Sequence, residues 1–184
     1  SITIDSNRGY NIGDNAYALG NFAGTEAIEK MNRNVTISNN YCDGSRYHTI
    51  LVAGGKDVTI ENNLIINCGI KEDMFPNLPS SVNTAGIALH CASVDYGYQS
   101  NILVRNNKIF DSLERGIFAF DRQDAVTAGL YSVNIKAIDN FVTGCGMRTT
   151  AQTLYGTGGI EFRFAKNIGN EIKGNYVSYN RGLG

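Results

Sequence analysis

The sequence contains the stretch Asp57-Val-Thr-Ile-Glu-Asn-Asn-Leu-Ile-Ile-Asn-Cys-Gly69, and variants of it recur along the chain. Within it, Val58 and Ile60 alternate with polar residues, as a strand with one buried face requires. Asn62 and Asn63 then predict a bend, because asparagine tolerates the left-handed backbone region and its amide forms local hydrogen bonds. The extended pattern resumes at Leu64. The stretch therefore predicts a repeat unit of strand, bend and strand.

Further copies of this unit align on Asn63, each with alternating apolar residues before its asparagine. The aligned residues are Asn7, Asn40, Asn63, Asn107, Asn140 and Asn175, so 33, 23, 44, 33 and 35 residues separate successive copies. These intervals are too irregular for an array of helical hairpins. They suit stacked coils with connections of variable length.

A second column of short strands follows the asparagines. Three copies begin with Gly-Ile and end with an apolar residue, at 86–89, 116–119 and 159–162. The fourth copy is Thr-Ile-Leu-Val at 49–52. Each coil is therefore expected to hold two or three short strands that pair in parallel with the neighbouring coils, at a spacing of about 4.8 Å. Residues 1–184 are expected to form one domain of about six such coils.

This order of motifs resembles the right-handed parallel β-helix of the pectate-lyase-like superfamily, in which apolar-x-apolar-x-x-Asn-x-apolar alternates with Gly-Ile-x-apolar. The resemblance covers nearly the whole chain and implies an all-β solenoid. It concerns scaffold motifs, so it names no reaction. The superfamily includes polysaccharide lyases, hydrolases and phage tailspike depolymerases. The resemblance thus implies an extracellular protein, secreted or virion-associated, and by analogy with tailspikes a homotrimer.

The composition and net charge of the chain argue against nucleic acids and membranes as binding partners. The net charge of −1, the 18% of charged residues and the lack of a basic run give no reason to expect nucleic acid. No apolar run approaches the roughly 20 residues that span a bilayer, so membrane insertion is not expected. A solenoid needs caps for its terminal coils, and neither end shows a polar capping segment. We therefore expect these residues to be the middle of a longer protein.

The four cysteines are expected to be free structural thiols. Cys68 and Cys145 lie five residues after their aligned asparagines, where other copies have serine. Two coils would separate them by about 10 Å, which is beyond disulfide reach. Cys42 falls in the core column of Ile65, and Cys91 follows a strand. Because no Cys-x-x-Cys pair exists, no metal site is predicted from them.

Three segments are expected to project as loops, near 70–84, 121–132 and 147–155. All three lie before or after the Gly-Ile column, so they are expected to wall the outer face of that column. Insertions in repeat proteins cluster on one face and commonly build a binding site, although a tolerated surface loop is the simpler reading.

Strand alternation predicts which residues line this outer face. The expected outward residues are Leu51, Ala88, Phe118 and Glu161 in one column, and Ala53, His90, Phe120 and Arg163 in the next. Aromatic rings beside charged groups suit an elongated carbohydrate, because sugar faces lie on rings while charged groups bind hydroxyls or carboxylates. A polysaccharide is the predicted partner, with Phe118, Phe120 and Arg122 as binding residues.

Glycoside hydrolysis is one candidate activity. It requires two carboxyl groups, about 5–5.5 Å apart for retention or 6.5–9.5 Å for inversion. Glu161 and Asp121 come from adjacent coils, and Asp124 is the substitute for Asp121. Because Glu161 and Asp121 occupy different columns, their separation could exceed that range.

Lyase chemistry is the other enzymatic candidate, in which a base removes a proton beside a uronate carboxylate that a cation or arginine neutralises. By resemblance, Arg163, Arg122 and His90 are the residues to test, and calcium is a possible cofactor, although the family's acidic calcium cluster is not evident. A uronan epimerase would share this base chemistry. The alternatives are a non-catalytic adhesin or a carbohydrate-binding fibre segment, in which Glu161 and Arg163 form an ordinary exposed pair.

Overall fold

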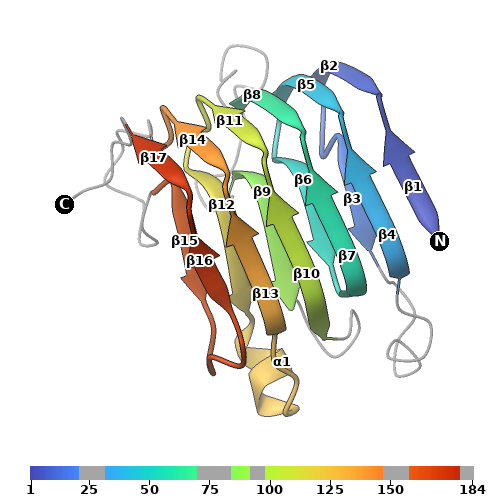
Figure 1. The fold of residues 1–184 in the computed structure, drawn as a ribbon, viewed down its shortest axis with the longest axis vertical. Coiled ribbons are helices and arrows are strands. Elements are labelled where there is room, and N and C mark those ends of the chain that lie inside the picture. Colours follow the sequence, from blue (N-terminus) through green and yellow to red (C-terminus); the bar gives the residue numbers. More distant parts are fainter. Residues whose placement is uncertain (21–31, 70–83, 92–97, 147–157, 179–184) are drawn as a thin grey trace.

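The protein is a parallel β-helix in the computed structural model, which describes residues 1–20, 32–69, 84–91, 98–146 and 158–178. Three parallel sheets run along its axis, and the chain adds one coil after another from the N-terminus to the C-terminus (Figure 1). In each sheet, neighbouring strands come from successive coils. The predicted all-β solenoid of about six coils is confirmed.

Each sheet takes one strand from every coil that contributes to it. Sheet A contains β1 (Ile2–Asp5), β4 (Arg33–Ser38), β7 (Gly55–Glu61), β10 (Gln99–Arg105), β13 (Val133–Ile138) and β16 (Glu171–Lys173). Sheet B contains β2 (Arg8–Ile12), β5 (Tyr41–Ser45), β8 (Leu64–Cys68), β11 (Lys108–Phe110), β14 (Phe141–Thr143) and β17 (Tyr176–Ser178). Sheet C contains β3 (Tyr17–Gly20), β6 (His48–Ala53), β9 (Ala85–Cys91), β12 (Arg115–Asp121) and β15 (Ile160–Arg163).

The core lies inside the coils and is built from columns of like side chains. Val58 pairs with Val35 and Ile102, and Ile117 pairs with Ile87 and Ile160, so apolar residues of successive coils stack on one another. Apart from Ile160, which is partly buried, these side chains are at most 1% exposed. Burial of each such side chain stabilises the fold by about 2 kcal/mol.

The asparagine column forms a continuous hydrogen-bonded ladder at the corner between sheets A and B. Each side-chain Nδ2 donates to the Oδ1 of the asparagine in the next coil, at 2.9 to 3.0 Å, from Asn7 through to Asn175. The same oxygens also accept the backbone N–H of the preceding coil's asparagine, as Asn63 Oδ1 does from Asn40 at 3.0 Å. The column therefore satisfies buried polar groups at a corner that the sheet ladders cannot reach.

The bend and the ladder belong to two different residues in each coil. The residue before the ladder asparagine has a positive φ, such as 57° at Asn62, 54° at Asn106 and 66° at Gly174. Asparagine, aspartate and glycine tolerate this region, which explains their frequency at this position. Asn63 itself contributes its amide to the ladder.

The structure differs from the sequence-based expectations in two elements. A strand, β3, joins sheet C from the first coil although it lacks the Gly-Ile motif. The segment 121–132 is not only a loop, because it holds the short helix α1 (Gln123–Thr127), whose Ala125 is buried. The segments predicted to project near 70–84 and 147–155 lie almost wholly outside the described residues.

The cysteine predictions are confirmed for the described thiols. Cys42, Cys68 and Cys145 are buried thiols that form no disulfide with one another. Cys42 pairs with Ile65, and Cys68 pairs with Ser45, as the column alignment predicts. Burial raises the pKa of Cys42 to about 11 and that of Cys145 to about 12, so both are unreactive thiols at neutral pH. The side chain of Cys91 lies outside the described residues.

Candidate functional site

The outer face of sheet C brings together the residues predicted for it. Phe118 pairs with Ala88 and Glu161, and Phe120 pairs with His90 and Arg163. The predicted register of both outward columns is thus confirmed. The chemistry of the side chains on this face changes from coil to coil.

Aromatic rings occupy the middle of this face. The rings of Phe118 and Phe120 stack at a centroid distance of 4.8 Å, and the His90 ring lies 4.4 Å from Phe120. Phe118 is only 3% exposed, because the Arg115 guanidinium lies over its ring at 4.2 Å and the Phe120 ring stacks against it. The open position expected for Phe118 is therefore wrong, whereas Phe120 is half-buried.

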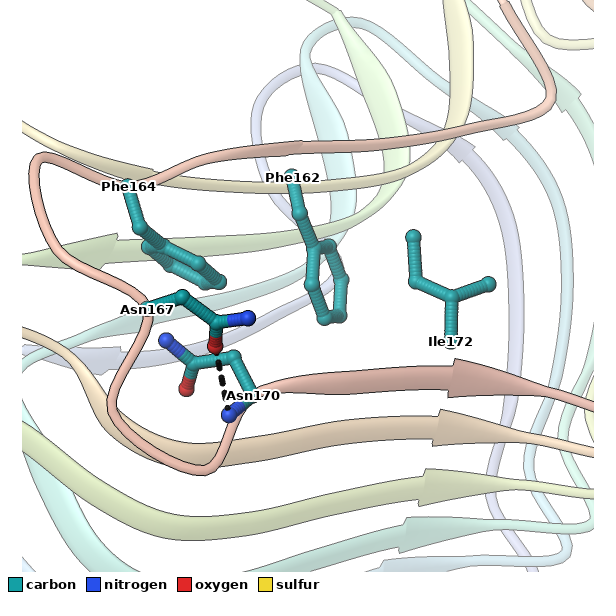
Figure 2. Close-up of a pocket in the computed structure, with 5 residues that line it drawn as sticks. All are labelled: Phe162, Phe164, Asn167, Asn170 and Ile172. Carbon is teal, nitrogen blue, oxygen red and sulfur yellow. Dashed lines mark hydrogen bonds between the residues drawn. The ribbon is translucent and has the colours of Figure 1, made fainter.

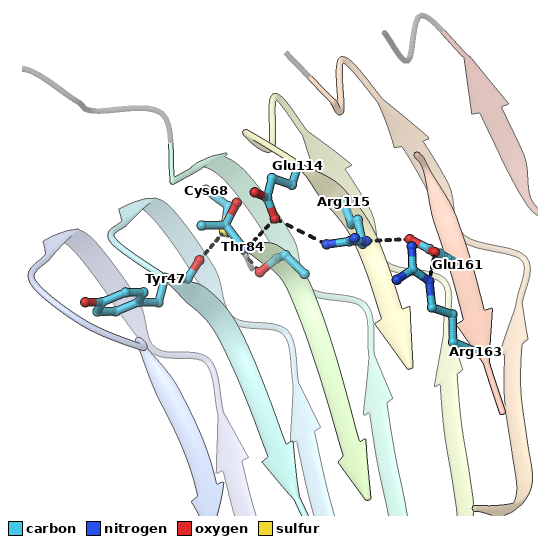
Figure 3. A network of polar contacts seen from close by, with 8 residues as sticks. Tyr47, Cys68, Thr84, Glu114, Arg115, Glu161 and Arg163 are labelled. Atoms are coloured by element: carbon cyan, nitrogen blue, oxygen red, sulfur yellow. Dashed lines mark hydrogen bonds and ion pairs between the residues drawn. The ribbon is translucent and has the colours of Figure 1, made fainter. Parts of the chain in front are cut away.

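A chain of charges crosses the same face (Figure 3). Arg115, whose side chain is fully buried, contacts Glu114 Oε2 at 3.2 Å and Glu161 Oε2 at 2.5 Å. The other oxygen of Glu161 binds Arg163 Nε, and Glu114 also accepts the backbone N–H of Thr84 at 2.9 Å. A buried guanidinium is tolerated only when carboxylates compensate it. Glu161 is therefore fixed between two arginines.

Exposure increases along this charge chain. The side chains of Glu114 and Arg115 are 5% and 0% exposed, whereas those of Glu161 and Arg163 are 21% and 37% exposed. The buried Arg115 holds the more exposed Glu161 in position through their ion pair. Arg163 pairs with Phe120 in the neighbouring strand. Phe120 and Arg163 are thus register partners at the accessible part of the face, and the Arg163 guanidinium lies 5.7 Å from the centre of the Phe118 ring.

Asp121 and Asp124 have other roles in the structure. Asp121 lies three residues beyond the position that pairs with Glu161, about 10 Å along the strand. Its Oδ1 accepts hydrogen bonds from the Ser132 N–H at 3.0 Å and hydroxyl at 2.5 Å, and its Oδ2 accepts from Ala165 N–H at 3.1 Å. Asp124 lies 3.3 Å from Arg122 at the start of α1, and both are exposed. Register thus separates these carboxylates from Glu161 along the sheet.

His90 lies close to a second histidine that the sequence analysis did not select. Its ring is 5.3 Å from that of His48 in an edge-on arrangement. Burial lowers the pKa of His48 to about 4 and that of His90 to about 3. Within the described residues, His48 Nδ1 and His90 Nε2 are buried without a hydrogen-bond partner. Both imidazoles are therefore neutral at pH 7.

Sequence reasoning missed Glu114, Arg115 and His48 for one reason. His48, Ala85 and Arg115 share one register column directly before the second strand motif, and no common residue type marks that column. A signal existed in the dipeptide Glu114-Arg115, because two charges immediately before a buried Gly-Ile strand require partners.

Figure 2 shows a cavity of about 330 Å³ in the last described coil. Its lining combines apolar side chains with two amides: Phe162, Phe164, Ile172, Asn167 and Asn170. Phe162 and Ile172 belong to the inward columns, since they pair with Ala119 and Ala137. The cavity is therefore a space next to the core, and none of the described residues that line it is charged.

No group of three or more histidine, cysteine, aspartate or glutamate side chains that could hold a metal occurs among the described residues. In the same parts of the chain, no helix is long and apolar enough to cross a membrane.

Fold and site together define a class of protein, a parallel β-helix whose sheet C has a charged and aromatic outer face. In comparisons with known proteins, no protein-family model, no curated protein and no solved structure matches the chain. The assignment to this class therefore rests on strand pairing and on the asparagine ladder.

Proposed function

We propose that this protein binds an extended polysaccharide along the outer face of sheet C. The observation that carries the proposal is the neighbouring position of Phe120 and Arg163, which are paired in adjacent strands and partly exposed. An aromatic ring accepts the apolar face of a sugar, and a guanidinium binds hydroxyls or a carboxylate in a fixed geometry. Glu161 holds the Arg163 guanidinium in place, which reduces the ordering cost of binding.

We also infer that the chain belongs to the pectate-lyase-like superfamily. The support is the order of its columns, in which the asparagine ladder separates sheets A and B and the Gly-Ile strands form sheet C. On this inference the protein acts outside the cell, secreted or as part of a virion, and a homotrimeric assembly follows by analogy.

Binding is tested with the full chain on an array of acidic and neutral polysaccharides. Arg163→Gln and Phe120→Leu are expected to weaken binding about tenfold each, because each removes one principal contact. Arg105→Gln is the matched control: Arg105 is paired to Glu61 at 2.7 Å on sheet A, with side-chain exposures of 48% and 21%. Equal losses in Arg163→Gln and Arg105→Gln, or no glycan bound by the unchanged protein, would contradict the proposal.

Cleavage of the bound glycan is the second candidate function. It is favoured by the position of Glu161, a carboxylate fixed on the outer face one coil from Phe118 and beside Arg163. New reducing ends without ultraviolet absorbance would indicate a hydrolase, and new reducing ends together with the ultraviolet absorbance of unsaturated products would indicate a lyase. Loss of either signal in Glu161→Gln, with binding retained, supports catalysis, whereas unchanged turnover removes Glu161 from the reaction.

A further inference from the structure

The outer face of sheet B carries a stripe of rings that neither the core nor the sheet C face uses. Two outward columns run along it, and each coil contributes an aromatic or aliphatic side chain. Rings of neighbouring coils touch in three places: Tyr10 with Tyr41, Phe110 with Phe141, and Phe141 with Tyr176. Tyr10 and Tyr176 are 55% and 54% exposed.

Within this stripe the same arrangement occurs twice. Tyr10 and Tyr41 lie with ring centroids 5.4 Å apart at an angle of 52°, and Phe110 and Phe141 lie 5.6 Å apart at 44°. A cation accompanies each ring pair. Arg8 pairs with Tyr41, and Lys108 pairs with Phe141.

The repetition is visible in the sequence once the register is known. Asn7-Arg8-Gly9-Tyr10 and Asn107-Lys108-Ile109-Phe110 each place a cation directly after the ladder asparagine and a ring two residues later. The next coil in each case supplies the second ring directly after its own asparagine, Tyr41 or Phe141. The ladder therefore sets both sites in the same geometry.

Both cations are available to a ligand. Arg8 and Lys108 are exposed, and within the described parts of the chain neither forms an ion pair. The single carboxylate in the outward columns, Asp43, already accepts a hydrogen bond from Asn67 at 2.8 Å. Arg8, Tyr10 and Tyr41 also line a hollow of about 250 Å³.

We propose that these are two equivalent subsites for acidic sugar units of one glycan that runs along sheet B. Three coils separate them, which corresponds to about 14 Å. Leu64 and Ile66, both half-buried, continue the apolar surface between the subsites. In each subsite the ring pair receives the apolar face of a sugar, and the cation binds its carboxylate or sulfate group.

The charges favour a glycan over a second copy of the chain. Isologous contact between two such stripes would bring cations against cations, and the one carboxylate in the outward columns, Asp43, already accepts a hydrogen bond from Asn67, so this contact is costly. An anionic polymer instead complements both cations at once. The inference rests on the proposed polysaccharide function, but it uses a different sheet from the site around Phe120 and Arg163.

The test is calorimetric titration of the full chain with oligogalacturonates, with their carboxyl-reduced forms and with heparin-derived sulfated oligosaccharides. A dimer reaches one subsite and an octamer reaches both, so the octamer is expected to bind at least tenfold more tightly than the dimer. Carboxyl reduction should abolish binding to sheet B. The uronate and sulfate series identify which anion is preferred.

The variant Arg8→Gln/Lys108→Gln is expected to remove the octamer's advantage, whereas Lys136→Gln on sheet A should leave it unchanged. An advantage that survives in Arg8→Gln/Lys108→Gln but disappears in Arg163→Gln overturns this inference and leaves the proposed function standing. Absence of binding to every glycan tested overturns both. A dimer in sedimentation that dissociates on Tyr10→Ser/Phe141→Ser substitution would show that the stripe binds protein instead.

Discussion

The asparagine corner and the outer face of sheet C are built from the same six-coil stack, yet they follow opposite rules. At the corner one residue type recurs in every coil, and each buried amide has hydrogen-bond partners. On the sheet C face the residue changes from coil to coil, and two buried imidazole nitrogens lack partners among the described residues. Repetition therefore marks what the stack needs for folding, and variation marks where other chemistry can be placed.

Breaking the corner is expected to have the largest effect on stability. Asn63→Ala removes hydrogen bonds to Asn40, Ile37 and Asn107 and leaves several buried groups unpaired. The expected loss is about 4 kcal/mol in the free energy of unfolding, measured with urea. Asn134→Gly, at a half-buried position with φ of 55° and an exposed side-chain hydrogen bond, is the control and should cost less than about 1 kcal/mol. Equal losses would contradict the structural role of the ladder.

Breaking the charge chain of sheet C ranks next. Arg115→Met keeps an unbranched apolar stem but leaves the carboxylate of Glu114 buried without its guanidinium. The expected loss is about 3 kcal/mol. Glu114→Gln in the Arg115→Met background should recover part of it, and a double-mutant cycle measures the coupling. Additive effects would show that the two side chains do not interact.

Lowering the pH is expected to destabilise the fold through the two buried histidines on the sheet C face. The folded-state pKa of His48, about 4, is below the ordinary 6.5 because the ring is buried, so only the unfolded chain takes up the proton as pH falls below 6.5. Stability is therefore full above pH 6.5 and decreases towards pH 4, by up to about 3 kcal/mol.

The measurement compares urea unfolding of the unchanged protein and His48→Phe at pH 7.5 and pH 4.5. The variant should lose less stability between these two values, because it cannot bind the proton when unfolded. His90→Phe should act in the same direction, since burial and then the neighbouring His48 lower the pKa of His90. Parallel pH profiles for all three proteins would refute this account.

Asp121→Asn is expected to lower stability less than the substitutions at the ladder, the charge chain and the histidines. One oxygen of Asp121 binds Ser132, and the other accepts the backbone N–H of Ala165. Asparagine retains one acceptor oxygen, so the expected loss is about 1 kcal/mol in thermal or urea unfolding. Asp124→Asn at the exposed helix α1 should change stability by less than about 0.5 kcal/mol. Equal changes in stability for the two variants would show that the hydrogen bonds of Asp121 to Ser132 and Ala165 do not stabilise the fold.

The asparagine corner could be predicted from the sequence because every coil makes the same physical demand on the residues at this corner. Every ladder position must supply one amide acceptor and one amide donor, and only a few residue types tolerate the positive φ before it. The Gly-Ile column was predictable for a similar reason. A side chain at Gly116 would lie within 2.3 Å of Val142, so the close approach of coils requires glycine there.

The rest could not be predicted, because it depends on contacts between coils that carry different residues. Arg115 contacts Glu161, a residue 46 positions away, only because the two coils stack in register. Helix α1 has five residues and no apolar periodicity of its own, so its pattern does not differ from that of a loop. The burial of Phe118 follows from the guanidinium above it, which the strand alternation does not reveal.

The amide ladder also keeps the spacing between successive coils constant. Successive ladder asparagines are 23 to 44 residues apart in the sequence, yet each Nδ2 to Oδ1 step has nearly the same length. Peptide segments of very different length can therefore connect the strands of successive coils without altering the spacing between those coils. A designer could use this property to set recognition groups at chosen multiples of about 4.8 Å.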